Sequence, residues 1–464
     1  MTAIRTARFN AAALAACLLG GCAVGPTYQR PSTPEPAAFK EAQGWAPAAP
    51  ADLLERGPWW ALFNDPVLDG LAGRVEVSNQ NVAAAVASYA QARALVAEQR
   101  ASLFPVVGLN TSADRSGGGD TNTEGRYRLS IGGSWEPDIF GRLRAGVGAV
   151  SANAQASAAD LAAAKLATQG ELAINYFLVR EADAQLALLA TTIEGYERVL
   201  KITQNRFDAG IVAKSDVLQA QTQLANAQGD QLTIARQRAQ FENAIAILVG
   251  QAPSSFSLAA APWTGTGPDI PPGLPSTLLE RRPDIAAAER RVAAANEQIG
   301  IARSAYYPSI GLSGSIGTGG SKVGDLFSVS NALWSFGLSA AQSIFNAGAT
   351  RANVAGAEAQ HQATVARYRQ TVLEAFGDVE NQLSAARILA SQQVLRKQAS
   401  DAASQVEAQM LNRYKAGQVG YTEVVLAQAS ALSARRALVQ VQADRQATAV
   451  ALIQSIGGGW MAGR

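Results

Sequence analysis

Proline is distributed very unevenly along this 464-residue chain, and this limits its fold more than any other feature. Of the 18 prolines, eight precede residue 67, seven lie within 253–283, and three stand alone at 105, 137 and 308. Because proline disrupts helix interiors, the proline-free windows 138–252 and 309–464 permit very long helices. Both windows are filled with Ala, Gln, Leu, Glu and Arg, which favour helix formation.

Two very long helices are predicted within these windows, over residues 141–205 and 347–412. At 1.5 Å per residue each would extend roughly 100 Å, which is too long for a compact domain. In the first helix, apolar residues recur every three or four positions and form a narrow stripe: Leu172, Tyr176, Val179, Leu186, Leu189, Ile193, Tyr196 and Leu200. Shorter helices are predicted over 69–104, 215–249, 284–307 and 421–456. The long helices alone are also compatible with a coiled-coil dimer.

Four segments alternate between apolar and polar residues, as strands with one apolar face do: 106–114, 126–135, 309–317 and 331–342. Each has about 9–12 residues, the length of a tilted transmembrane strand. The intervening segments 115–125 and 317–330 are rich in Gly and Ser and are predicted to be loops. A soluble β-sandwich would show the same alternation. No apolar run of 18 residues follows residue 22, so membrane-spanning helices are not expected.

The N-terminus has the pattern of a secretory signal peptide. Two arginines precede a short apolar stretch, residues 9–19, that is too short to span a bilayer. It ends in Leu19-Gly20-Gly21-Cys22, which resembles the bacterial lipobox, so we expect cleavage after residue 21 and lipidation of Cys22. An ordinary signal peptide with Cys22 as a free thiol is the alternative. The residues that follow are rich in Pro and Ala, which indicates a tether.

The chain repeats itself after 203–207 residues. Leu103-Phe104-Pro105 corresponds to Tyr306-Tyr307-Pro308, and the six residues 205–210 correspond to 412–417. Both copies of the second motif end in glycine, as expected where a left-handed residue ends a helix. Each half therefore has the order helix, strand, strand, long helix, turn, helix, with the turns at 206–212 and 413–419. The predicted organisation is a signal peptide (1–21), a lipidated tether (22–66), a first repeat (67–252), a Pro-rich linker of the equatorial region (253–283), a second repeat (284–457) and a C-terminal tail (458–464).

Four strands alone would leave open sheet edges, which are unstable in lipid because unsatisfied backbone groups there cost several kcal/mol each. Closure needs several chains, giving eight strands in a dimer, twelve in a trimer or sixteen in a tetramer. The signal peptide, the lipid anchor and the polar second face favour an outer-membrane barrel over a sandwich. A polar inner face favours a lumen and hence three chains or more. Arg126 and Arg128, on the polar side of their segment, would face this lumen.

Composition argues against several other functions. The chain has 39 Lys+Arg against 37 Asp+Glu, so it lacks the concentrated basic charge expected of a nucleic-acid partner. With one histidine and two cysteines, a His- or Cys-based metal site is not expected. We therefore expect no enzyme activity and no cofactor apart from lipid on Cys22. A non-conducting lipoprotein scaffold with coiled-coil rods and a hydrolase with paired carboxylates remain alternatives; the alternating segments argue against the first, and no defined carboxylate pair supports the second.

Further motifs resemble the TolC-like outer membrane factors, especially their lipoprotein branch: Gly25-Pro26 after Cys22, Trp59-Trp60 with Phe63-Asn64-Asp65-Pro66, the run Trp135-Glu136-Pro137-Asp138-Ile139-Phe140-Gly141-Arg142, and Arg281-Arg282-Pro283-Asp284. The resemblance covers nearly the whole chain. It implies the exit duct of a tripartite efflux or type I secretion system, mainly α, with a long antiparallel coiled-coil α-barrel in the periplasm. Four strands from each chain of a homotrimer would complete a 12-stranded transmembrane β-barrel.

The same resemblance implies the partners and the location. A periplasmic adaptor would couple the duct to an inner-membrane pump, and the pump would choose the substrate. Alanine at position 23 points to the outer membrane of a Gram-negative bacterium. The two turns would form a tip on which the adaptor docks, through Arg206, Phe207, Gly210, Tyr414 and Gly417.

By the same resemblance, a gate would follow the second turn. Glu423 matches the first of two acidic residues of the family, whereas Leu426 stands in place of the second. A ring of three mutually repulsive Glu423 carboxylates and a hydrophobic constriction at Leu426 are therefore alternative gates. Asp216 is the equivalent of Glu423 in the first half. Arg413 would either hold the closed state through a salt bridge or lie solvated at the surface.

Overall fold

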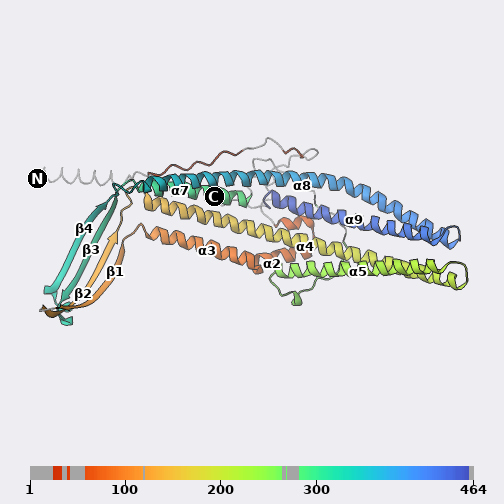
Figure 1. The fold of residues 1–464 in the computed structure, drawn as a ribbon, viewed down its shortest axis with the longest axis horizontal. Helices are drawn as coiled ribbons and strands as arrows, with labels where there is room; N and C mark the ends of the chain where they lie inside the picture. Colours follow the sequence, from red (N-terminus) through yellow and green to blue (C-terminus); the bar gives the residue numbers. More distant parts are fainter. Residues whose placement is uncertain are drawn as a thin grey trace. The chain divides into compact units, whose positions relative to one another are not determined.

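The computed structural model describes residues 24–33, 39–41, 58–118, 121–263, 268 and 282–458. The predicted signal peptide and Cys22 lie outside these residues, as do much of the tether, much of the linker 253–283 and the tail after residue 458. Contacts divide the chain into two units, one formed by 1–33, 87–158 and 287–370, the other by 34–86, 159–286 and 371–464. The first unit contains the four strands, and the second contains both turns between long helices (Figure 1).

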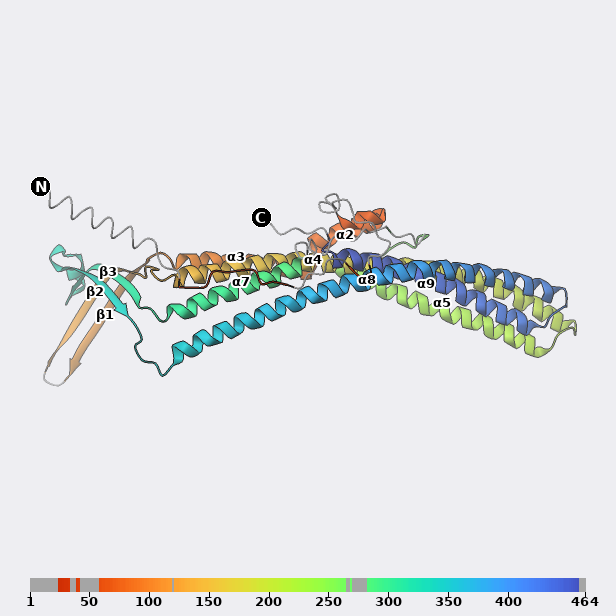
Figure 2. The same cartoon turned by 90° about the horizontal axis from the view of Figure 1, so that it is seen from above.

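The long helices follow the predicted segments closely (Figure 2). The two longest are α4 (Arg142–Asp208) and α8 (Ala349–Lys415), each of 67 residues. They are followed by α5 (Lys214–Leu248) and α9 (Tyr421–Ser455), each of 35 residues. A shorter helix, α7 (Pro283–Ser304), precedes the second pair of strands. None of the helices in the described ranges has an apolar stretch that could cross a membrane.

The prediction of one helix over 69–104 is wrong, because this segment forms α2 (Pro66–Ser78) and α3 (Gln80–Ala101). The break is at Asn79, whose extended backbone (φ −70°, ψ 128°) ends α2. Its Oδ1 accepts hydrogen bonds from the N–H groups of Asn81 and Val82 (2.9 and 3.1 Å), which caps the start of α3. Its Nδ2 donates to the carbonyl oxygen of Leu248 at the end of α5 (2.8 Å). Asn79 therefore satisfies backbone groups at several helix ends, which explains why the chain bends here.

In the first unit, four strands form one antiparallel sheet in the order β1-β2-β3-β4. They are β1 (Val106–Gly118), β2 (Thr121–Trp135), β3 (Ser309–Gly320) and β4 (Ala332–Ala341). All four predicted strands are confirmed, but the predicted loops are too long. β1 and β2 pair as far as Gly118 and Thr121, because a hairpin ladder satisfies the backbone groups of Gly and Ser as well as those of any other residue. β3 likewise continues to Gly320, and the 3₁₀ turns η4 (Val323–Phe327) and η5 (Val329–Asn331) precede β4.

The register gives this sheet one apolar and one polar face, as alternation predicts. On the apolar face, one row crosses all four strands: Leu109, Ile131, Ile316 and Trp334. On the polar face, the corresponding row is Gly108, Gly132, Ser315 and Ser335, and the last two hydroxyl groups lie 2.9 Å apart. The large apolar side chains of β4 are exposed in the single chain, with Trp334 at 80%.

The residues expected to be a simple tether make specific contacts where they are described. In the first unit, Gly25 lies so close to Gly300 of α7 that a Cβ on either would approach the other's Cα to about 3 Å. The Asn296 Nδ2 donates to the carbonyl oxygen of Pro26 (2.8 Å), and the Tyr28 hydroxyl donates to Glu289. In the second unit, the backbone N–H groups of residues 40 and 41 donate to the carboxylate of Glu380 (2.6 and 2.9 Å). Residues 24–33 and 39–41 are therefore bound to helices rather than free.

Two features form the core of the second unit. The apolar stripe predicted on α4 is buried there, and Leu172, Tyr176, Val179 and Leu189 are each at most 1% exposed. The 3₁₀ turn η2 (Trp59–Phe63) packs its aromatic rings on this helix, with Phe63 4.9 Å from Phe177 between ring centroids.

The second feature is a buried charged cluster centred on Asp183. Its carboxylate accepts from Arg180 Nη1 (3.0 Å) on the same helix and from Arg238 Nε (2.6 Å) on α5. The two guanidinium groups also donate to the carbonyl oxygens of Ala259 (2.7 Å) and Leu258 (2.6 Å). The cluster therefore fixes the described beginning of the 253–283 linker to α4 and α5.

Candidate functional site

The two turns between long helices have the same backbone geometry. At the end of α4, Gly210 has φ +71°, its N–H donates to the Phe207 oxygen (2.8 Å), and Ile211 N–H donates to the Arg206 oxygen (2.8 Å). At the end of α8, Gly417 has φ +72°, with equivalent bonds of 2.9 Å to the oxygens of Tyr414 and Arg413. These are Schellman motifs, in which glycine supplies the left-handed residue. The predicted role of both glycines as helix C-caps is confirmed.

One arginine ties the two helix hairpins together. Arg206 Nη1, from α4, donates to the carbonyl oxygen of Tyr414 on α8 (2.7 Å), and its guanidinium lies 4.7 Å from the centre of the Tyr414 ring. The Tyr414 hydroxyl lies 3.2 Å from Thr203 Oγ1, and its ring packs against Tyr421 of α9 at 5.4 Å between centroids. Val424 lies in the same cluster. The cluster thus joins α4, α8 and α9 beside the turns.

This arrangement changes the role expected for two residues. Tyr414 was expected on an adaptor-docking surface, but it is only 2% exposed and cannot touch a partner directly in this conformation. Arg206 is partly buried over it, whereas Arg413 is exposed and lies on α8 next to Tyr414. Thr203 and Tyr421 were not among the residues predicted for this site. Thr203 lies three residues before Arg206 and Tyr421 four residues after Gly417, and this spacing from the turns is the only local signal for either residue.

The predicted gate residues lie at the start of α5 and α9. Glu423 and Leu426 are both exposed and three residues apart, so they occupy one face of α9, and Leu426 is 65% exposed. Asp216 is in the first turn of α5. It lies close enough to Tyr421 to contribute, after burial and the neighbouring tyrosines Tyr414 and Tyr196, to raising the pKa of the Tyr421 hydroxyl.

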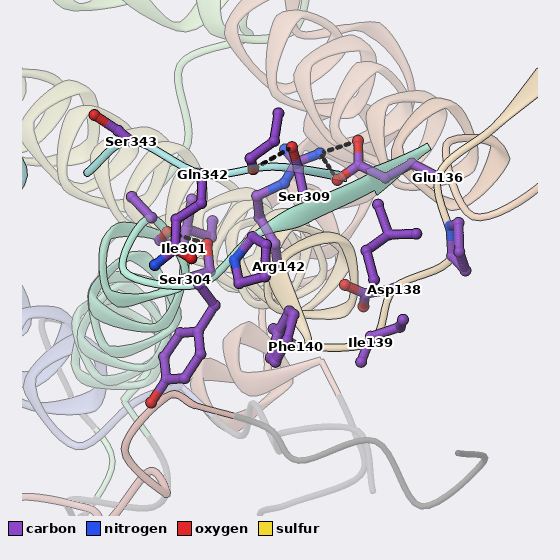
Figure 3. Close-up of a pocket in the computed structure, with 16 residues that line it drawn as sticks. Glu136, Asp138, Ile139, Phe140, Arg142, Ile301, Ser304, Ser309, Gln342 and Ser343 are labelled. Carbon is purple, nitrogen blue, oxygen red and sulfur yellow. Dashed lines mark hydrogen bonds and ion pairs between the residues drawn. The ribbon is translucent and has the colours of Figure 1, made fainter. Parts of the chain in front are cut away.

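In the first unit, a cavity of about 250 Å³ lies where strands meet helices (Figure 3). Arg142, the first residue of α4, donates from Nη2 to both oxygens of Glu136 (2.8 Å each). Asp138 accepts from the backbone N–H groups of Leu143 and Arg144 (3.0 and 2.8 Å), so it caps the helix. The ring of Phe140 stacks on Tyr307, with centroids 4.9 Å apart. The motif run 135–142 therefore anchors a strand-to-helix junction.

The residues predicted to face a lumen lie on the polar side of the sheet. Arg126 pairs across the strands with Asp114, and Arg128 with Ser112. Both arginine side chains are exposed in the single chain. In the described part of the chain, no three His, Cys, Asp or Glu residues are grouped so that they could hold a metal ion.

The arrangement of two long helix hairpins and one two-faced sheet recurs in known proteins. The profile of the outer membrane efflux protein family matches residues 71–251 and 274–458, the greater part of the chain. The chain belongs to the outer membrane efflux protein family. The resemblance to outer membrane factors is thereby confirmed. The protein is an outer-membrane efflux channel, and its family consists of transport conduits.

Individual relatives of this efflux protein match over almost their full length. The solvent efflux pump outer membrane protein SrpC of Pseudomonas putida is 31% identical over 455 residues, covering 96% of each chain. The cation efflux system protein CusC of Escherichia coli O6:H1 is 30% identical over 456 residues, covering 96% of this chain and 97% of CusC. A solved structure of the outer-membrane channel OprN superposes with a TM-score of 0.88 at 30% identity, covering 95% of this chain and 100% of that one.

One buried acid in the second unit of this efflux protein is poised to titrate near neutral pH. The Glu181 side chain is on α4 and only 6% of the residue is exposed. Burial raises the pKa of its carboxyl group to about 7, against the opposing hydrogen bond from Gln185 Nε2 (2.6 Å). The negative charge of Asp444, on α9, raises the pKa further.

Replacing Glu181 with glutamine is expected to stabilise the protein at pH 8 by about 1–2 kcal/mol. This is less than the free energy that the full pKa shift would correspond to, because the carboxyl group keeps some solvent contact. The folded state binds this proton more tightly than the unfolded chain, so the stability that Glu181 contributes is fully present below pH 4.5 and is lost as the pH rises through 7. Glutamine does not titrate. The check is the apparent unfolding midpoint of both proteins by circular dichroism at 222 nm between pH 5 and 8.5. Glu194→Gln, at an exposed position on the same helix, is the control. If Glu181→Gln raises the unfolding midpoint by the same amount at pH 5 and at pH 8, the raised pKa of Glu181 is contradicted.

Proposed function

We propose that three copies of this efflux protein form one passive exit duct, in which their strands close a 12-stranded barrel and their helices a long periplasmic α-barrel. The observation that carries the proposal is the sheet of the first unit. One face is apolar and exposed, the other is lined by Ser, Gly and Arg, and β1 and β4 are the outer strands. In lipid, the unpaired backbone groups of β1 and β4 must find hydrogen-bond partners. A closed barrel of 12 strands provides them and encloses a lumen that the polar face can line.

The proposed gate lies at the start of α9. Three exposed Glu423 side chains would attract cations and repel one another, while three Leu426 side chains would narrow the path by dewetting. Arg413, exposed beside the turn, would bridge neighbouring copies in the closed state, and Asp216 would lie near the same constriction. Supporting this, Arg206 already ties the two hairpins within one copy, so the turns are held in a defined arrangement.

We further propose that a periplasmic adaptor docks on the exposed parts of the turns and opens the gate, coupling the duct to an inner-membrane pump. This surface would include Arg206, Phe207, Gly210 and Gly417. Tyr414 is buried below Arg206 and would hold that side chain in position. A covalent lipid on Cys22 would add an anchor in the outer membrane, with no other cofactor. Relatives named for solvent and for cation efflux are about equally similar to this chain, which supports a pump, rather than the duct, as the selector of substrate.

Single-channel recording in planar bilayers tests this function. The purified wild-type protein, trimeric by native mass spectrometry, is expected to conduct in small steps, because the gate is closed without an adaptor. Arg413→Ala is expected to raise the conductance several-fold, and Glu423→Ala to reduce the preference for cations. Lys397→Ala, which removes an exposed ion pair with Asp401 further along α8, is the matched control and should leave both unchanged. A trimer whose conductance none of these variants alters would place the gate elsewhere, and a protein that never conducts would support the scaffold alternative.

A further inference from the structure

The two outer strands of the sheet are unpaired on one side each. β1 is exposed along its described side chains, and every residue of β4 except Gly337 is exposed. The inner seam between the two hairpins, by contrast, is the regular pairing of β2 with β3. The pairing of β2 with β3 therefore shows how a further strand can pair with each of the two outer strands.

The ends of the two hairpins are built alike. Trp135 Nε1 donates to the oxygen of Leu103 (2.9 Å), and Gln342 Nε2 donates to the oxygen of Tyr306 (3.0 Å). The two acceptor residues, Leu103 and Tyr306, are 203 residues apart in the chain, and the two donor residues, Trp135 and Gln342, are 207 residues apart. Gly141 (φ +81°) and Gly348 (φ +87°), just before α4 and α8, are also 207 residues apart. β3 is therefore the counterpart of β1 at a shift of 203, and β4 the counterpart of β2 at a shift of 207.

We infer that β4 of one copy pairs with β1 of the next in the register that the inner seam dictates, with Ser339 opposite the partner subunit's Ser112. In the inner seam, Gly132 of β2 lies opposite Ser315 of β3. Moving Gly132 forward by 207 residues gives Ser339 of β4, and moving Ser315 back by 203 residues gives Ser112 of β1. In the same way, Trp135 opposite Leu312 becomes Gln342 opposite the partner subunit's Leu109. This inference rests on the trimeric barrel proposed above and specifies how its copies join.

The alternation of side chains provides an independent check. Ser339 and Ser112 both belong to the polar face, whereas the next pair, Leu338 and the partner subunit's Ala113, belongs to the apolar face on both sides. A slip of one residue would bring polar-face positions opposite apolar ones. The derived register therefore continues both faces of the sheet across the seam without interruption, although the faces played no part in deriving it.

Aromatic side chains next to the strands fit the same seam. Within one chain, Phe140 stacks on Tyr307, which lies in the connection between α7 and β3. Phe104 holds the position of Tyr307 before β1, but it is 67% exposed. The connection after β4 carries Phe345, which is 88% exposed. The 207-residue shift carries Phe140 to Ala347, and Phe345, two residues earlier in the same connection, is the aromatic side chain available to cover the partner subunit's Phe104 at the seam between copies.

Disulfide trapping tests this register sharply, because the chain has no cysteine after Cys22. Three pairs are introduced with Cys22 retained: Ser339→Cys with Ser112→Cys, and, as controls, Ser339→Cys with Asn110→Cys or with Asp114→Cys. All lie on the polar face, but directly opposite Cβ atoms are about 4.5–5.5 Å apart and diagonal ones about 7–8 Å, beyond the reach of a disulfide. After oxidation in outer membranes, the first pair is expected to give heat-resistant covalent oligomers that disappear on reduction, at least ten-fold more than either control.

The outcomes separate this inference from the proposed trimer. A protein that is trimeric by native mass spectrometry, but crosslinks best through a control pair or through none, overturns the register and leaves the barrel standing. A monomeric protein without crosslinks overturns both. As a second readout, Phe345→Ala is expected to lower the temperature at which the trimer dissociates, whereas Phe327→Ala, similarly exposed but in η4, should not. Equal effects of the two substitutions would contradict the aromatic contact.

Discussion

Replacing Gly250 with alanine is expected to destabilise the second unit by about 3–4 kcal/mol. Gly250 follows α5 with φ +70°, where an alanine alone costs about 1–2 kcal/mol. In addition, a Cβ at this position would lie 2.2 Å from the carbonyl oxygen of Ser78. This oxygen belongs to the backbone at the end of α2, next to Asn79, so it cannot move aside without breaking the capping that Asn79 provides. The measurement is the apparent unfolding midpoint by circular dichroism in detergent.

Gly210→Ala is the matched control for this prediction. Gly210 has nearly the same backbone conformation (φ +71°) and also ends a helix, but a Cβ there would meet no atom within 4 Å. It should therefore cost only the conformational penalty of about 1–2 kcal/mol. If the two variants lose the same stability, the close approach between Gly250 and Ser78 is not a significant constraint.

The second large effect is expected at the buried charged cluster, where Asp183→Ala should cost about 3–5 kcal/mol. Asp183 is the carboxylate that balances Arg180, and its own side chain is 3% exposed. Without Asp183, the Arg180 guanidinium stays buried with no carboxylate beside it, and Arg238 loses one of its two carboxylate partners. Such a loss is costly because desolvation of a charge is no longer offset by a partner. Thermal unfolding monitored at 222 nm measures the effect.

Asp230→Ala provides the comparison for Asp183. Asp230 on α5 pairs with Arg436 on α9 at 2.8 Å, but both side chains are substantially exposed. Exposed pairs contribute about 1 kcal/mol or less, so this variant should remain close to wild type. Limited proteolysis adds a specific readout: Asp183→Ala, but not Asp230→Ala, should accelerate cleavage near residues 258–261, whose backbone the two arginines hold. Equal cleavage rates in the two variants would show that the cluster does not fix this segment.

The candidate site was predictable to the extent that it depends on local sequence. The glycines at 210 and 417 follow long helices in matching motifs, and a left-handed residue at a helix end has few substitutes. The choice between the two arginines of these motifs was not predictable. Arg206 and Arg413 occupy equivalent positions, so the sequence treats them alike; only the packing of α4 against α8 places Arg206 over Tyr414 and leaves Arg413 exposed. Tyr414 was assigned to a docking surface for the same reason, because burial depends on neighbours more than 200 residues away.

The sequence by itself determined the long helices, the four strands and the two turns of this protein. These follow from short-range properties: the absence of proline over long windows, a period of two residues in the strands, and glycine where φ must be positive. Only the tertiary structure decided the break at Asn79, the cluster around Asp183, and the strand register. Each of these joins residues from separate elements, and the hydrogen bonds and charges that fix them are satisfied by partners whose identity no local pattern specifies.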